Sequence, residues 1–231
     1  DLSVECNINF VPDGNESAVF NDCTGHGSAV AGIIGASRNE TGIDGINPEV
    51  ELYSVKVLDS DNKSPLNRII DGIYWSIEND IDIINMSFGT DIDSDILHNA
   101  IIDAYNAGIL LIAAAGNTQH QDVQFPAAYD EVISVGSVSS SGELSKMTSV
   151  NNQLDILAPG ENILTSSFLD TVSTLSGTSM AAAQVTGIAS LIWAKDISKS
   201  NRFVMELICS AVNKPSTLEG VNAGIVNFEA A

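Results

Sequence analysis

The chain has 231 residues, of which 44% are hydrophobic, and this length and composition are ordinary for one globular domain with a sizeable core. Its 30 acidic and nine basic residues give a net charge of -21. Such a surface repels phosphate backbones and anionic membranes, which excludes nucleic acid as a partner. Polar residues interrupt every long apolar run, so we expect no membrane span. We expect one monomeric domain over residues 1–231.

The three cysteines, Cys6, Cys23 and Cys209, fit neither a metal-ligand spacing nor an even disulfide framework. A bridge between Cys6 and Cys23 and free buried thiols are both open at this point. The first residues, DLSVEC, contain no basic segment followed by an apolar one, so no leader is recognisable in them. Sequence before residue 1 could have been removed, which leaves the compartment open.

From residue 50 onward, the apolar spacing alternates between that of a strand and that of a helix. Segment 51–58 is a β-branched apolar run, and segment 66–80 repeats isoleucine at helical spacing. The later predicted elements are a strand over 81–89, a helix over 96–108, strands over 109–117, 132–138 and 154–160, and helices near 179–194 and 201–213. This alternation indicates an α/β fold, a doubly wound and mostly parallel sheet in three layers with helices on both faces.

In open α/β sheets, ligands bind beyond the carboxyl ends of the strands, and this rule locates the chemistry. Two of the predicted strand ends carry Ser87-Phe88-Gly89 and Ala115-Gly116-Asn117. Asn117 by itself is weak evidence for a functional site, because Gly-Asn is a common loop dipeptide after a strand. The strand ends therefore indicate where a site lies, and other residues must indicate what it does.

Ser179 opens the Ala-rich stretch in GTSMAAAQVTG, residues 177–187. It is either an ordinary helix N-cap or a nucleophile placed where backbone amides and the helix dipole favour negative charge. His26 stands between two glycines ahead of a helix-like apolar run, whereas His98 and His120 read as surface residues. A base candidate, an amide donor and a hydroxyl at a helix start are together the parts that acyl transfer requires.

The motifs resemble those of the subtilisin-like serine proteases, in that family's order and over nearly the whole chain. GHGSAVAG is similar to the family's histidine motif, AAAGN to its oxyanion segment and GTSMAAAQVTG to its serine motif. The segments SVKVLDSDN and IDIINMSFG resemble its substrate-cleft strands, and FPAAY and LDILAPG resemble the run that follows the oxyanion segment. The resemblance implies a subtilisin-like fold and a serine endopeptidase that acts on polypeptides.

The resemblance also implies roles for particular residues. His26 is the general base, Ser179 the nucleophile and Asn117 the side-chain donor to the oxyanion. The implied substrate-binding residues are Leu66, Ser87, Phe88, Gly89, Ala115, Gly116 and Gln124. Gln124 stands where the family often has a glycine in the wall of the primary specificity pocket, so we expect a narrowed pocket that prefers small or medium P1 side chains. An α/β-hydrolase is disfavoured, because its triad runs Ser, acid, His along the chain.

One part of the family's triad has no match. The aspartate of the Asp-Ser/Thr-Gly motif is not found, and Asp1-Leu2 resembles the pair that follows that motif, so the first strand is expected to be missing. Asp13 and Asp22 are read as solvated loop carboxylates. The alternatives are truncation and a catalytically inactive pseudoprotease that serves as a binding or regulatory module. We favour truncation, because His26, Asn117 and Ser179 have no evident reason to persist together in an inactive scaffold.

The resemblance further implies a structural calcium site, a partner and a compartment. The calcium ligands would be the Asp1 and Asn39 side chains and the carbonyls of Ser37, Thr41 and Ile43, a set of oxygens that suits calcium. Glu40 and Asp44 add negative charge nearby or simply face solvent. A propeptide is a further expected partner, and secretion is favoured over an intracellular location without excluding it.

Overall fold

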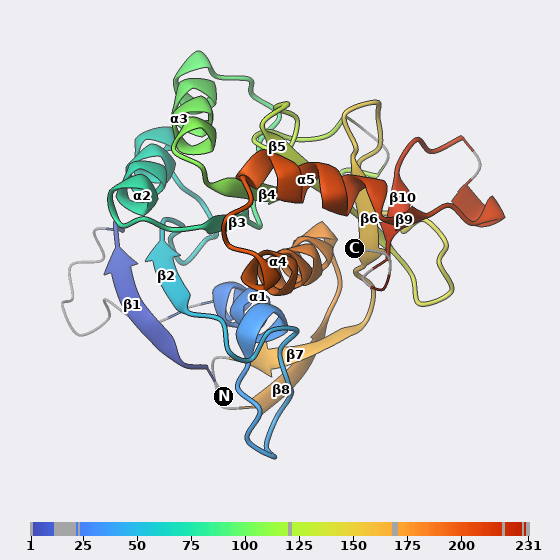
Figure 1. Cartoon of the computed structure of the whole chain (residues 1–231), viewed down its shortest axis with the longest axis horizontal. Helices are drawn as coiled ribbons and strands as arrows, with labels where there is room; N and C mark the ends of the chain where they lie inside the picture. Colours follow the sequence, from blue (N-terminus) through green and yellow to red (C-terminus); the bar gives the residue numbers. More distant parts are fainter. Residues whose placement is uncertain are drawn as a thin grey trace.

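The structure is a computed structural model that describes residues 2–11, 22, 24–119, 122–167, 171–218, 220–227 and 229. Figure 1 shows a central sheet with helices on both of its faces. None of the described helices is both long and apolar enough to cross a membrane.

The largest sheet has six strands in the order β3-β4-β5-β6-β10-β9. Pairing is parallel from β3 to β10, and β9 joins the edge in antiparallel orientation. The strands are β3 (Ile83–Met86), β4 (Leu110–Ala114), β5 (Val132–Val138), β6 (Ile156–Pro159), β9 (Val212–Asn213) and β10 (Gly224–Val226). The mostly parallel sheet expected from the sequence is confirmed.

Two smaller sheets flank it. Strands β1 (Val4–Asn9) and β2 (Leu52–Lys56) pair in parallel, and β7 (Ile163–Ser167) and β8 (Thr171–Leu175) form an antiparallel pair. The sequence predicted β2 as part of one continuous sheet. Among the described residues, however, β2 pairs only with β1 and β3 only with β4, so the parallel sheet is divided between β2 and β3.

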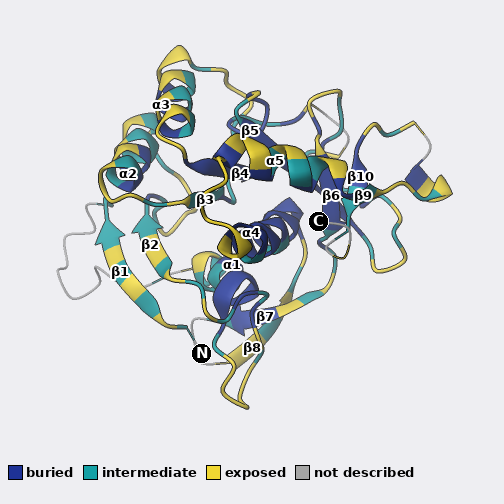
Figure 2. Ribbon diagram, in the orientation of Figure 1, coloured by how far each residue is buried: buried dark blue, intermediate teal, exposed yellow. Residues whose placement is uncertain are grey.

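In the described ranges, five α-helices complete the layers: α1 (His26–Gly35), α2 (Leu66–Glu78), α3 (Asp95–Asn106), α4 (Thr178–Lys195) and α5 (Asn201–Ser210). A short 3-10 helix spans Ser216–Leu218. Alanine, glycine and other small residues let α4 pack closely on the sheet, and most of the helix is buried (Figure 2). The helix that carries Ser179 is therefore the most enclosed one.

The alternation of side chains along β4 divides the core into two parts. Leu110, Ile112 and Ala114 point into a buried cluster with α4 and α5. Leu111 and Ala113 point into a second cluster with α2 and α3. Side chains in a strand alternate between faces, so a strand that is apolar on both faces lies between two layers of helices. This arrangement is the three-layer fold that the sequence predicted.

Two local predictions were wrong. The last helix does not reach residue 213, because Val212 and Asn213 pair with β10 instead. His98 is not a simple surface residue, since its ring stacks on Tyr129 at 4.1 Å and its Nε2 lies 3.0 Å from Glu131 Oε2. His120 lies outside the described residues.

Candidate active site

His26 is the first residue of α1, and the carboxylate of Asp22 fixes the chain around it. Asp22 Oδ1 accepts hydrogen bonds from the amides of Gly25 (2.9 Å) and Thr24 (3.1 Å), and Oδ2 accepts one from the amide of Ser28 (2.7 Å). Ser28 lies in the first turn of α1, where N–H groups lack partners within the helix, and Thr24 and Gly25 lead into that turn. Asp22 is thus a capping residue and not the solvated charge that the sequence suggested. Asp13 lies outside the described residues.

The charges of this pair affect each other. Burial lowers the pKa of His26 below the usual value for histidine, and the negative charge of Asp22 offsets only part of that effect. Burial alone would raise the pKa of Asp22, but the hydrogen bonds from Ser28, Thr24 and Gly25 outweigh it and lower the pKa. Within the described part of the chain, no hydrogen bond reaches the His26 ring.

Ser179 is the second residue of α4, and Gly177 holds the cap position, so the reading of Ser179 as an N-cap is wrong. Gly177 has a φ of 154°, a conformation that other residues rarely adopt. The Ser179 side chain is nearly buried, and its Oγ donates a hydrogen bond to the carbonyl of Ser87 (3.2 Å). Ala29 of α1 and Met180 of α4 share one buried cluster, which packs the first turns of the two helices together.

Asn117 follows β4 and is held against the start of α4 by Thr178. Its Oδ1 accepts hydrogen bonds from the Thr178 amide (3.0 Å) and from Thr178 Oγ1 (3.2 Å). The Gly116 amide also donates to Thr178 Oγ1 (3.3 Å). Because the oxygen of the carboxamide is held in this way, its NH₂ group is left to donate elsewhere, beside Gly177 and Ser179. The arrangement suits an oxyanion.

Gln124 fills the space between Gly89 and Gly116, at the two strand ends where the family resemblance places the substrate cleft. A Cβ atom added at Gly116 would lie 2.6 Å from Gln124 Oε1, and one added at Gly89 would lie 2.8 Å from it. Gln124 Nε2 donates to Asp91 Oδ1 (2.8 Å), and Thr90 and Phe125 exchange two backbone hydrogen bonds of 2.9 Å next to it. The Gln124 side chain is therefore held between the two strand ends by contacts on both sides.

The remaining residues expected to bind substrate differ in how far they are buried. Leu66 opens α2 and, like Phe88, is half-buried against the core, and Ala115 is fully buried. The Ala115 carbonyl accepts a hydrogen bond from the Gln124 amide (2.9 Å), so Ala115 positions Gln124 through its backbone and not through its side chain.

A cavity of about 740 Å³ lies between β2 and β3, where the parallel sheet is divided. Every residue of both strands lines it, and residues of α1, α2 and α4 line it as well. His26 and Asp22 also border the cavity. In Figure 1 the β1–β2 sheet stands apart from β3, with α2 beside both. Within the described ranges, β2 pairs only with β1 and β3 only with β4, so neither strand is paired across the cavity, and the candidate base lies on its wall.

Asp1 and the three cysteines were also singled out from the sequence. Asp1 and Cys23 are outside the described residues, whereas Cys6 and Cys209 are free thiols, so no Cys6–Cys23 bridge forms. Burial, together with the charge of Asp155, raises the pKa of Cys209 to about 12.

Sequence reasoning did not single out Thr178 or Asp91, and it misread Asp22. The adjacency of Thr178 to Ser179 was a usable signal, because the residue before a nucleophile shares its helix start. Asp91 gave no local signal, because it meets Gln124 only through the fold.

A mostly parallel sheet between helices, with Asn117 against the start of α4 beside Ser179 and His26 at the start of the helix that packs on α4, defines an α/β protein of the subtilisin-like type. The profile of the subtilase family matches residues 3–224, so the chain belongs to that family.

Its relatives agree with this assignment. The chain is 41% identical over 183 residues to the minor extracellular protease Epr of Bacillus subtilis (strain 168), which covers 79% of this chain and 28% of Epr. It is 36% identical over 235 residues to subtilisin DY of Bacillus licheniformis, covering 100% of this chain and 85% of that protein. The crystal structure of a cold adapted subtilisin-like serine proteinase matches with a TM-score of 0.80 at 29% identity, over 90% of this chain and 74% of that one. The chain thus spans only a small part of Epr and most of subtilisin DY.

Proposed function

We propose that the protein is a serine endopeptidase that hydrolyses peptide bonds through an acyl-enzyme on Ser179. The observation that carries this proposal is the junction of β4 and α4. There Thr178 holds the oxygen of the Asn117 side chain, so that the Asn117 NH₂ group and the Ser179 amide are available to one oxyanion. Among the described residues, no hydrogen bond uses the Ser179 amide. Family membership supports the same reaction class.

In the reaction, Ser179 Oγ leaves the Ser87 carbonyl and attacks the substrate carbonyl while His26 takes its proton. The tetrahedral oxyanion accepts hydrogen bonds from Asn117 and from the Ser179 amide. His26 then protonates the leaving amine, and water hydrolyses the acyl-enzyme by the reverse sequence of proton transfers. Because burial disfavours the protonated form of His26, a carboxylate beside the ring is needed to stabilise it.

We infer that an extended segment fills the cavity between β2 and β3 and supplies this carboxylate. In the part of the chain that the structure describes, no strand pairs with β2 or β3 on the side of the cavity, so their backbones can offer hydrogen bonds along both sides of such a segment. A strand that matches β2 or β3 in length would extend about 13–17 Å. Asp22 is a poor substitute, because both of its oxygens already accept amide hydrogen bonds. Asp-Ser/Thr-Gly shortly upstream of Asp1 in the gene would provide the segment.

An inactive binding or regulatory module of the same fold is the second candidate. It is favoured by one observation, namely that no carboxylate among the described residues forms a hydrogen bond or an ion pair with the His26 ring. Such a module would bind an extended polypeptide at the same cleft without cleaving it. The two candidates differ in whether peptide is turned over at Ser179.

The cleft supports an extended polypeptide as the substrate, bound by strand addition beside Ser87-Phe88-Gly89 and Leu66. At the P1 position, the Gln124 carboxamide occupies the space between Gly89 and Gly116 that a large side chain would need. We infer a preference for small or medium P1 side chains. A propeptide, a monomeric state and secretion are further proposals, and the name of Epr, an extracellular protease, supports the last.

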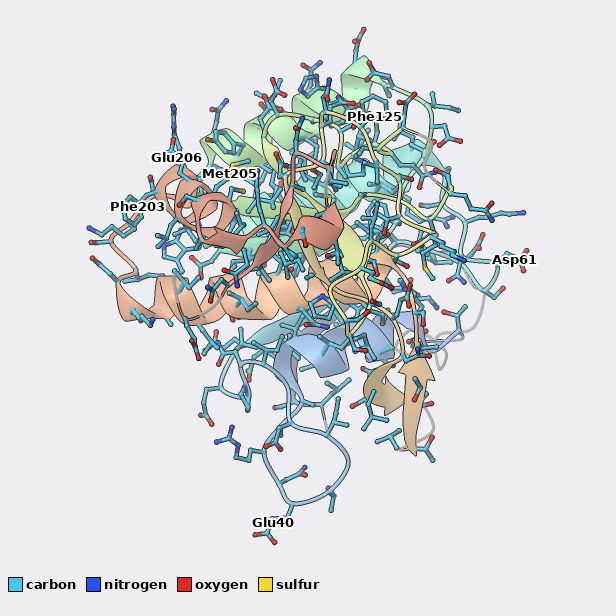
Figure 3. The ribbon with its side chains drawn as sticks, turned by 90° about the vertical axis from the view of Figure 1, so that its right-hand side faces the viewer. Glu40, Asp61, Phe125, Phe203, Met205 and Glu206 are labelled. Atoms are coloured by element: carbon cyan, nitrogen blue, oxygen red, sulfur yellow. The ribbon has the colours of Figure 1, made fainter. Side chains whose placement is uncertain are left out.

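The described residues of the loop do not present a fitting set of ligands for calcium. A calcium site there therefore stays an untested prediction. Asn39 Oδ1 already accepts hydrogen bonds from the amide (3.1 Å) and the hydroxyl (2.7 Å) of Thr41. Asp44 pairs with Arg38 (3.1 Å), and Glu40 points away from the tip of the loop into solvent (Figure 3). We therefore derive no role for the ion, and thermal melts with calcium and with a chelator test whether it binds.

The test of the proposed function compares residues 1–231 with the same chain extended upstream through the expected Asp-Ser/Thr-Gly. Both are assayed on one peptide at equal concentration, each beside its Ser179→Ala variant. We expect turnover in the extended protein, none with Ser179→Ala, and a loss of about 10⁴ in kcat without the upstream aspartate. Equal turnover by both chains would contradict the inferred segment, and peptide binding without turnover in the extended protein would favour the inactive module.

A further inference from the structure

A line of hydrogen bonds runs from the middle of α4 through the end of β3 and back to the nucleophile. Thr186 Oγ1 donates to Asn85 Oδ1 (2.9 Å), and Asn85 Nδ2 donates to Ser87 Oγ (2.9 Å). Ser87 Oγ in turn donates to the carbonyl of Ser179 (3.2 Å). We propose that Thr186 and Asn85 are positioning residues for Ser179 that act through Ser87. This inference rests on the proposed function.

The network lies inside the protein, where its geometry is restricted. Thr186 is 6% exposed and Ser179 is 8% exposed, and Asn85 and Ser87 are half-buried. A buried polar group that loses its partner costs free energy, so each member keeps the orientation that satisfies its neighbours. The four side chains therefore behave as one unit that joins two turns of α4 across β3.

The hydroxyl of Thr186 sets which group donates and which accepts in each hydrogen bond of this line. Its hydroxyl proton faces the carbonyl end of the Asn85 side chain, and the NH₂ end is thereby left to face Ser87. Ser87 Oγ accepts from that group and keeps its single proton for the carbonyl of Ser179. The carbonyl of Ala182 lies 3.0 Å from Thr186 Oγ1 and competes for the same proton. The hydrogen bond to Asn85 is thus the contact on which the direction depends.

Ser87 and Ser179 each donate a hydrogen bond to the other's carbonyl, and these two bonds couple the line to the nucleophile, Ser179 Oγ. Ser87 Oγ donates to the Ser179 carbonyl, and Ser179 Oγ donates to the Ser87 carbonyl, both over 3.2 Å. The position of Ser87 therefore sets the starting position of the nucleophilic hydroxyl. Without the Thr186 hydroxyl, the Asn85 carboxamide is free to turn over, to accept the Ser87 proton and to release the Ser179 carbonyl.

Ser190 offers a matched control on the same helix. It lies one turn beyond Thr186, is also buried, and accepts a hydrogen bond from Asn47 Nδ2 (2.9 Å) while donating to the Gly187 carbonyl (2.8 Å). None of these contacts leads to Ser179. A change at Ser190 consequently removes buried hydrogen bonds from α4 without altering the line to the nucleophile.

The experiment uses the whole gene product, with any sequence that the gene encodes before Asp1, and compares Thr186→Val, Thr186→Ser and Ser190→Ala with the wild type. Steady-state peptide hydrolysis gives kcat and KM separately, and thermal melts give stability. We expect Thr186→Val to lower kcat about tenfold with little change in KM, since it removes one net hydrogen bond behind the nucleophile. Thr186→Ser should restore kcat, and Ser190→Ala should lower Tm but not kcat.

Wild-type kcat in Thr186→Val, or an equal loss of kcat in Ser190→Ala, would overturn the inference. Crystal structures of the wild type and Thr186→Val give a readout that does not need activity. A longer distance between Ser87 Oγ and the Ser179 carbonyl in the variant supports the inference, and an unchanged distance overturns it. If the wild type has no activity, the proposed function fails, and the two crystal structures still decide the role of Thr186.

Discussion

Replacing Asp22 by alanine should loosen the start of α1, the helix that carries His26. Three backbone amides, those of Thr24, Gly25 and Ser28, lose their shared acceptor. Water replaces part of each contact, because Asp22 is only half-buried. The loss is therefore comparable to that of one good N-cap, about 1–2 kcal/mol. For a domain of this size, such a loss corresponds to a decrease of about 2–8 °C in Tm.

The effect of Asp22 should depend on pH in a defined direction. The folded protein holds the pKa of Asp22 below the ordinary value of 3.8. A carboxyl with a lowered folded pKa stabilises the protein fully above its unfolded pKa, and this contribution is lost as the pH falls through the folded pKa. The Tm difference between the wild type and Asp22→Ala should therefore be largest near neutral pH and should shrink below about pH 4.

Thermal melts from pH 3 to pH 7 measure this difference, and two further variants serve as comparisons. Asp22→Asn keeps an oxygen acceptor but no titratable charge, so its Tm should lie between those of the other two proteins at pH 7. Asp61→Ala removes an aspartate whose side chain points into solvent (Figure 3) and should change stability by less than about 0.5 kcal/mol. A Tm difference for Asp22→Ala that is the same at every pH, or no larger than that of Asp61→Ala, would refute the capping argument.

Three further predictions follow from burial and packing. Gln124→Gly should raise kcat/KM for a Phe or Tyr P1 residue by about tenfold or more relative to an Ala P1 residue, because it opens the space between Gly89 and Gly116. Profiling with a peptide library measures this preference, and an unchanged preference would contradict the prediction. Cys209, whose pKa is raised to about 12, should resist iodoacetamide in the folded protein at pH 8 and react after unfolding. Peptide mapping measures the alkylation, and rapid alkylation of the folded protein would disprove the burial of this thiol. Ile112→Ala should lower the free energy of unfolding, measured with urea, by about 2–5 kcal/mol, because the Ile112 side chain is fully buried. A decrease of less than about 1 kcal/mol would argue against the packing of β4 on α4.

The sequence was most informative where an element is buried on both faces. The predicted strand 132–138 coincides with β5, because all seven of its residues are buried and small or apolar. The β7–β8 hairpin was not predicted, since Ile163–Ser167 and Thr171–Leu175 are rich in hydroxyl residues and show no clear alternation of apolar and polar positions. The division of the sheet between β2 and β3 was not predicted either, because an unpaired strand edge leaves no mark in local composition.

The site was predictable where its residues follow short-range rules. Glycines beside His26, Asn117 and Ser179 mark positions where the backbone turns tightly, and these positions could be read from the chain. The hydrogen bond between Asp91 and Gln124 spans 33 residues and depends on the bridge between Thr90 and Phe125. Contacts of this kind require the registry of the folded sheet, so no local pattern could have given them.

We expect the separate β1–β2 sheet to open more easily than the six-stranded sheet. A two-stranded sheet has little stability by itself, and local opening concentrates where few strands share hydrogen bonds. In a concentrated solution of an active endopeptidase, every molecule is also a substrate for its neighbours, and cleavage starts where an extended backbone is released first. A segment seated between β2 and β3 would join this sheet to the larger one, so the group that completes catalysis would also protect the enzyme against autolysis.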